Sequence, residues 1–172
     1  MIEKYCRIAL ERMKIPLLGC IPHENKLTKP NFEQVVKVIE GKRLNGKSHG
    51  IKNRVNKVII GAMAAEGLVK HLEAGLLIIT PGDREDIISK IIDSDCPADQ
   101  KNIAGVILTR NTALDKKLME SLYQTNIPIA LCANDSYEVA SKINNMTVKT
   151  QPCDQDKIPI IKELITKSID LG

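Results

Sequence analysis

The 172-residue sequence has no tryptophan, one phenylalanine and three tyrosines. The core must therefore be built from aliphatic side chains, and proteins that stack nucleic-acid bases on aromatic platforms are disfavoured. No apolar run approaches the roughly 18 residues of a transmembrane helix. The charged N-terminus lacks the apolar region of a signal peptide. We therefore expect a cytoplasmic protein without a membrane partner.

Recognisable catalytic and metal-binding patterns are also lacking. The five cysteines are scattered without a Cys-x-x-Cys pair, which argues against a disulfide framework and against a zinc site. The motifs G-x-x-x-x-G-K-[ST], G-x-G-x-x-G, G-x-S-x-G and H-E-x-x-H are absent. Cys132 has no histidine close to it in the sequence, so we interpret it as a small buried hydrophobic residue. We predict no catalytic residue, no metal and no cofactor, and we do not expect intrinsic enzymatic activity.

Short apolar segments alternate with amphipathic ones along most of the chain. Continuous apolar runs predict buried strands at residues 58–60, 76–79, 103–108 and 127–131. Helical spacing of apolar residues predicts helices at residues 2–14, 31–40, 64–73, 83–92, 112–123, 136–143 and 157–169. Buried strands that alternate with helices are typical of a parallel sheet covered on both faces. We predict a three-layer α/β/α fold with a mainly parallel sheet of about four to six strands.

Two further segments depart from this regular pattern. Residues 15–22 form a short apolar run bounded by prolines, which predicts a strand that ends at Pro22. Residues 41–57 contain six lysines and arginines and no acidic residue, and they predict a strand fragment at 43–44 followed by a long mobile loop. A solvated loop is the favoured interpretation of this basic stretch, and a nucleic-acid-binding surface over residues 42–57 is the alternative.

Polar residues follow the predicted strands at the edge of the sheet where ligands of open parallel sheets bind. Gly82 allows a close backbone approach, Arg84 supplies a forked cation, and the next helix begins with unpaired N–H groups. The competing interpretation is that Asp83 and Asp86 only cap that helix. The predicted ligand-binding residues are Thr80, Gly82, Asp83, Arg84, Thr109, Arg110 and Asn111.

These residues resemble a known family, the DRTGG domain. Residues 81–88 read Pro-Gly-Asp-Arg-Glu-Asp-Ile-Ile, between Gly-Leu-Leu-Ile-Ile-Thr at 75–80 and Gly-Val-Ile-Leu-Thr at 105–109. Residues 61–63, Gly-Ala-Met, also resemble the family. The threonine of the family's Asp-Arg-Thr element is Glu85 here, and its Gly-Gly is Arg110-Asn111. The lost glycines hinder close backbone approach to a ligand, whereas Arg110 adds a cation.

The resemblance extends upstream, where residues 18–27 are similar to the junction that precedes the DRTGG domain of long bacterial phosphotransacetylases. In those proteins a BioD-like P-loop domain comes first and the acetyltransferase domain last. The resemblance thus implies three parts: residues 1–25 as the end of a P-loop domain, residues 26–150 as the DRTGG-like domain, and residues 151–172 as a helix packing on it. It also implies a fold like the N-terminal domain of HPr kinase.

Three functions are compatible with these observations. The resemblance favours a non-catalytic regulatory or oligomerisation module that binds a nucleotide or another phosphate-bearing ligand. It also implies a homodimer and a linked or separate catalytic partner domain. The second hypothesis is a segment of a phosphate acetyltransferase or of a BioD/CobB-like ATPase, without its own active site. The third, a nucleic-acid binder through residues 42–57, is the least favoured.

Overall fold

The computed structural model describes residues 2–45, 53–93, 103–112, 114–152 and 154–169. The chain divides into two compact units, which are described separately. One combines Met1–Thr28 with Lys149–Gly172, and the other is Lys29–Val148.

The larger unit is built around a five-stranded sheet of order β1-β5-β4-β3-β2. Its strands are β1 (Lys42–Arg43), β2 (Lys57–Ile60), β3 (Leu76–Pro81), β4 (Gly105–Thr109) and β5 (Ile129–Leu131). Strands β2 to β5 are mutually parallel, and β1 pairs antiparallel with β5 at the edge. The predicted mainly parallel sheet is therefore confirmed.

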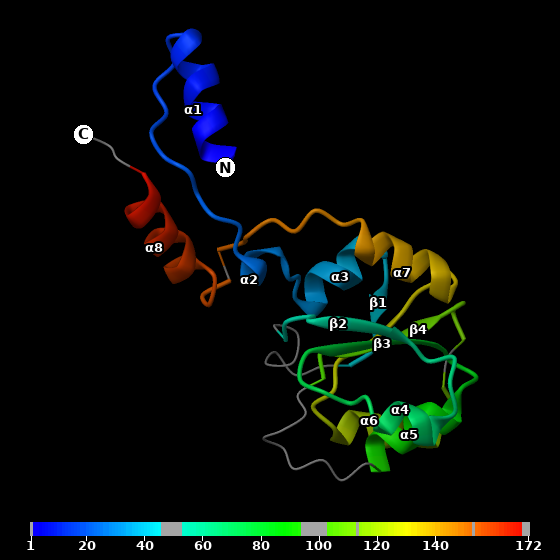
Figure 1. Cartoon of the computed structure of the whole chain (residues 1–172). Coiled ribbons are helices and arrows are strands. Elements are labelled where there is room, and N and C mark those ends of the chain that lie inside the picture. Colours follow the sequence, from blue (N-terminus) through cyan, green and yellow to red (C-terminus); the bar gives the residue numbers. More distant parts are fainter. Residues whose placement is uncertain (1, 46–52, 94–102, 113, 153, 170–172) are drawn as a thin grey trace. The chain divides into compact units, whose positions relative to one another are not determined.

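Helices cover both faces of this sheet, as Figure 1 shows. The helices of this unit are α3 (Phe32–Val38), α4 (Ala65–Val69), α5 (Glu85–Asp93), α6 (Lys116–Gln124) and α7 (Ser136–Asn144). Helices α4, α5 and α6 lie on one face, and α3 and α7 lie on the other. The three-layer α/β/α prediction is confirmed.

The apolar runs of the sequence explain the two cores. Because successive side chains of a strand point to opposite faces, Leu76 and Ile78 pack with α4 to α6, whereas Leu77 and Ile79 pack with α3 and α7. All four are fully buried. A central strand buried on both faces needs such a continuous apolar run.

Helix starts are defined by capping side chains that periodicity does not reveal. Asp115 accepts hydrogen bonds from the backbone of Lys117 and Leu118, so α6 begins four residues later than the predicted 112. Asn31 and Asp135 form capping boxes at α3 and α7, and both starts agree with prediction to within a residue. Helix α4 ends at Val69, short of the predicted 73.

The smaller unit contains α1 (Ile2–Arg12), α2 (Asn25–Thr28) and α8 (Ile158–Ser168). The short helix α2 is not among the predicted elements. The buried Lys157 donates through Nζ to the carbonyl of Leu27 at 2.8 Å. Among the described residues, none of the helices combines the length and the apolar character needed to cross a membrane.

The predicted strand at 15–22 is wrong. Its one ladder contact within the described residues is an isolated antiparallel bridge between Gly19 and Ile169, and Leu18 and Ile21 are exposed. The segment is apolar, but no strand among the described residues lies alongside it to complete a ladder of hydrogen bonds. Of the predicted loop after residue 44, residues 46–52 lie outside the described part of the chain.

Candidate functional site

The predicted site residues come from two neighbouring turns at the carboxyl end of the sheet. In the parallel β3–β4 pair, Thr80 lies beside Leu108 and Pro81 beside Thr109. Residues 82–84 follow β3, and residues 110–111 follow β4. The sheet therefore brings the two predicted clusters to the same edge.

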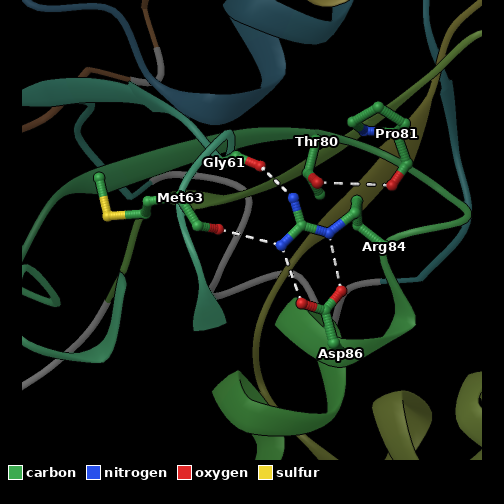
Figure 2. A network of polar contacts seen from close by, with 6 residues as sticks. All are labelled: Gly61, Met63, Thr80, Pro81, Arg84 and Asp86. Atoms are coloured by element: carbon green, nitrogen blue, oxygen red, sulfur yellow. Dashed lines mark hydrogen bonds and ion pairs between the residues drawn. The ribbon is translucent and has the colours of Figure 1, made fainter. Parts of the chain in front are cut away.

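Arg84 is held in place by four hydrogen bonds (Figure 2). Its Nε and Nη2 atoms each donate to the Asp86 carboxylate at 2.8 Å. Its Nη1 and Nη2 atoms also donate to the carbonyls of Gly61 and Met63, at 3.2 and 3.0 Å. The guanidinium thus links the start of α5 to the turn between β2 and α4.

The ion pair shifts the pKa values of both Arg84 and Asp86. The hydrogen bond from Arg84 lowers the pKa of Asp86, and the same hydrogen bond raises the pKa of Arg84. The two groups therefore remain a charged pair at neutral pH. Because the guanidinium already binds one carboxylate and two carbonyls, its first role is to join two turns of the protein.

Gly82 makes a close approach to another part of the chain. A Cβ atom at this position would overlap the carbonyl group of Thr112, which follows β4. The predicted close backbone contact at Gly82 therefore exists, and its partner is protein backbone. Thr80 is fully buried, and its hydroxyl donates weakly to the Pro81 carbonyl at 3.4 Å.

Arg110 and Asn111 both have left-handed backbones, with φ of 61° and 52°. By the resemblance, these are the positions of the family's Gly-Gly, and glycine adopts this conformation without steric strain. The left-handed pair turns the backbone toward the loop after β5. There Arg110 N–H donates to the Asn134 carbonyl at 3.0 Å, and Asn111 N–H donates to the Cys132 carbonyl at 2.8 Å.

A side-chain contact joins the same two loops. The Thr109 and Ser136 hydroxyl oxygens lie 3.1 Å apart, within hydrogen-bond distance. Thr109 is fully buried and Ser136 is half-buried, so the contact is partly shielded from solvent. The Oδ1 atom of Asn134 accepts a hydrogen bond from Nζ of Lys142 at 3.2 Å, and its Nδ2 atom donates to the Glu138 carboxylate at 3.1 Å. At the carboxyl end of the sheet, hydrogen bonds therefore link the turns that follow β4 and β5.

Exposure separates the predicted residues into two groups. Thr80, Gly82 and Thr109 are buried, and the Arg84 side chain is 31% exposed. Asp83, Arg110 and Asn111 are exposed. Within the described residues, the Arg110 guanidinium makes no hydrogen bond or ion pair. Ser136, Asn134 and the Gly61 carbonyl are not among the predicted site residues, although the polar run Asn134-Asp135-Ser136 after β5 is a signal for the first two.

Other candidate chemistry is limited at this edge. Among the described residues, no group of three His, Cys, Asp or Glu side chains is arranged to hold a metal ion. Cys132 is buried, and burial raises the pKa of its thiol, which disfavours a nucleophilic thiolate. In the basic 42–57 stretch, Lys57 forms an ion pair with Glu73 at 2.8 Å.

Comparison with known proteins identifies relatives of this chain. The DRTGG domain family matches residues 34–146. The phosphate acetyltransferases of Pseudomonas putida and Nitratidesulfovibrio vulgaris are 28% identical over 157 residues and 30% identical over 154 residues. The matches cover 90% and 87% of this chain but 22% of each relative. The chain therefore corresponds to about a fifth of these enzymes.

A solved structure shares the fold. It contains the CBS and DRTGG domains of the regulatory region of Clostridium perfringens pyrophosphatase, complexed with its activator, diadenosine tetraphosphate. The TM-score is 0.57 at 17% identity, over 95% of this chain and 69% of that chain. The family match and the shared fold agree with the resemblance of residues 75–88 and 105–109. This chain belongs to the DRTGG domain family.

Proposed function

We propose that this chain is a non-catalytic regulatory module that binds a small phosphate-bearing ligand, such as a nucleotide, at the carboxyl edge of its sheet. In this proposal Arg110 and Asn111 contact the ligand, and Asp83 lies at the margin of the site. Thr80, Gly82, Arg84 and Thr109 hold the surrounding turns in position.

The proposal rests mainly on the exposure, the lack of a side-chain partner within the described part of the chain and the position of Arg110. Its guanidinium is exposed, has no hydrogen-bonding or ionic partner among the described residues, and stands at the carboxyl end of the central strand β4. Ligands of open α/β sheets bind at this end, and a guanidinium matches the geometry of phosphate oxygens. The backbone hydrogen bonds to Asn134 and Cys132 fix the turn that presents it.

The relatives support a regulatory role. The related Clostridium perfringens region is regulatory, and its structure holds a nucleotide activator. In the phosphate acetyltransferases, the matched segment is 22% of the enzyme. A ligand-responsive module attached to different catalytic units is consistent with both relationships.

A thermal-unfolding screen of the whole chain tests the proposal. The compounds are diadenosine tetraphosphate, ATP, AMP, acetyl-CoA, acetyl phosphate and orthophosphate. A ligand present at 100 times its dissociation constant stabilises the folded state by about 2.7 kcal/mol, which raises the midpoint measurably. We expect a rise with at least one compound that is lost in Arg110→Ala and kept in Lys90→Ala, an exposed control on α5.

Two results would contradict the proposal. A rise of equal size in the wild type and in Arg110→Ala would locate the ligand elsewhere. If the midpoint stayed unchanged with every compound, the module would have a structural role only.

The matches to phosphate acetyltransferases favour a second candidate, in which the chain acts as a segment of such an enzyme. We expect the chain alone to transfer no acetyl group between acetyl-CoA and phosphate. Release of free CoA above background in an assay of the purified chain would overturn this expectation.

A further inference from the structure

A second cation reaches the turn that follows β5. Lys142 lies in the second half of α7, and helical side chains point toward the N-terminus of their helix. Its Nζ atom donates to Oδ1 of Asn134, eight residues earlier in the chain, at 3.2 Å. Burial raises the pKa of the neighbouring Cys132 thiol, and the positive charge of Lys142 partly opposes this effect. The ammonium group of Lys142 therefore lies at the carboxyl end of β5.

Lys142 and Arg110 are joined through the same residue. The backbone N–H of Arg110 donates to the carbonyl of Asn134 at 3.0 Å, and the N–H of Asn111 donates to the carbonyl of Cys132 at 2.8 Å. Asn134 thus connects the turn after β4 to the ammonium group of Lys142. Two cations from different elements, one on a turn and one on a helix, are brought to the same edge of the sheet.

The ammonium group of Lys142 keeps donors that a ligand can use. A lysine has three N–H donors, and the one hydrogen bond of this group within the described residues goes to the neutral amide of Asn134. Lysine is a strongly hydrated point charge, and it binds phosphate as such. Its side chain is half-buried, so the position of the charge is restricted without being closed off.

The carboxylates beside Lys142 are engaged elsewhere. Glu138 accepts hydrogen bonds from Nδ2 of Asn134 at 3.1 Å and from the N–H of Asp135 at 3.3 Å. The Asp135 carboxylate accepts from the N–H of Glu138 at 2.9 Å. These bonds form the capping box of α7. Among the described residues, Lys142 forms no ion pair with either carboxylate.

We propose that Lys142 is a second phosphate-binding residue of this edge and that the ligand contains at least two linked phosphate groups. Arg110 binds one phosphate group and Lys142 binds the next. Two cations on separate elements match the spread of negative charge along a diphosphate. The inference rests on the proposed function, because it adds a residue to the same site, and it narrows the ligand to a diphosphate or longer phosphate chain, either free or attached to a nucleoside.

Calorimetric titration of the whole chain, without divalent cations, tests the inference. The probes are orthophosphate and pyrophosphate, together with AMP and ADP, which show whether a nucleoside adds to the affinity. We expect the wild type to bind each diphosphate more tightly than the matching monophosphate. Lys142→Gln should raise the dissociation constant of pyrophosphate about tenfold, because a hydrogen bond to a charged group contributes on that order, and change that of orthophosphate less than about twofold.

Two further variants separate charge from local structure. Lys142→Arg keeps the positive charge and should retain the preference for diphosphates. Lys90→Gln removes an exposed lysine from α5 and should leave all four dissociation constants unchanged. The thermal-unfolding midpoint of each variant is measured in parallel, so that a loss of binding in a folded Lys142→Gln variant is attributed to the missing charge.

Three results would overturn the inference, and they are distinguishable from one another. If the wild type bound none of the four probes, the proposed function would fail together with it. If binding were lost in Arg110→Ala but the preference for diphosphates survived in Lys142→Gln, the site would stand and Lys142 would have no part in it. If Lys142→Gln weakened orthophosphate and pyrophosphate equally, both cations would bind a single phosphate group.

Discussion

Arg84 and Asp86, two residues apart, form a two-bond pair at 2.8 Å whose guanidinium also binds the carbonyls of Gly61 and Met63. The pair therefore fastens the first turn of α5 to the turn that follows β2. The sequence predicts that Arg84 binds a ligand, and the structure gives the same cation a role within the fold. The first two predictions test the role within the fold.

Arg84→Ala should lower the free energy of unfolding by about 1–2 kcal/mol. Hydrogen bonds from a charged donor contribute about 1.5–3 kcal/mol each when buried, and this side chain is 31% exposed, which reduces the effect. Urea denaturation measures the change. Lys90→Ala on the same helix should stay within about 0.5 kcal/mol of the wild type. Equal stability of Arg84→Ala and wild type would show that the four bonds contribute nothing.

Asp86→Asn should lose stability in a pH-dependent manner. The Arg84 hydrogen bond lowers the folded-state pKa of Asp86, so the stabilisation is fully present above the ordinary aspartate pKa near 4. It is lost as the pH falls through the lowered folded pKa. The stability difference from wild type should stay constant from about pH 8 to about pH 5 and shrink below about pH 4.

The comparison is made by urea denaturation at each pH. Glu85→Gln removes the same charge from the same helical turn and leaves both bonds between Arg84 and Asp86 intact. Its stability difference should be smaller. A difference for Asp86→Asn that is as large at pH 3 as at pH 7 would contradict the role given to the ion pair.

The left-handed turn at Arg110 predicts opposite effects of two substitutions. Arg110→Gly should raise stability by up to about 1 kcal/mol, because the strain of a left-handed non-glycine residue is removed. Arg110→Val should lower it by about 1–2 kcal/mol, because a β-branched side chain fits this conformation poorly. Thermal unfolding of both variants measures this. If they were equally stable, the backbone at this position would not be left-handed in solution.

Substitution by alanine should have opposite effects on stability at Gly105 and Gly67. Gly105 has φ +153°, and a Cβ atom there would overlap the ring of the buried Phe32, so Gly105→Ala should cost more than about 2 kcal/mol. Gly67 lies in α4 with only ordinary contacts to Met63, so Gly67→Ala should stabilise the protein by about 0.5–1 kcal/mol. Denaturant midpoints distinguish the two, and a tolerated Gly105→Ala would contradict the packing of Phe32 on β4.

Local patterns predict most elements of the larger unit, since the four parallel strands and each of its described helices overlap the segments that periodicity indicates, although some helix ends differ. The predictions fail where the structure of a segment depends on contacts that its apolar pattern does not show. Residues 15–22 have the composition of a strand, but in the described part of the chain no strand lies alongside them to complete a ladder. Helix α6 begins later than predicted because the apolar periodicity extends upstream of the true start, which Asp115 sets by capping.

The candidate site shows the same division. Its position at the carboxyl ends of β3 and β4 follows from the order of strands and helices. The assignments of residues 1–25 and 151–172 to parts flanking the DRTGG domain stay predictions, as does ligand binding by the seven site residues. Which of these residues can reach a ligand depends on exposure, which separates Arg110 and Asn111 from the buried Thr80 and Thr109.

The sequence was sufficient for the alternation of buried strands and amphipathic helices, because the burial of apolar side chains is encoded by local periodicity. Only the tertiary structure determined which distant segments contact one another. It pairs β1 antiparallel with β5, places Gly82 against Thr112, and brings the carbonyl of Gly61 to Arg84 across 23 positions of the chain. Such contacts depend on which turns the completed sheet brings together, and no local pattern of residues carries that information.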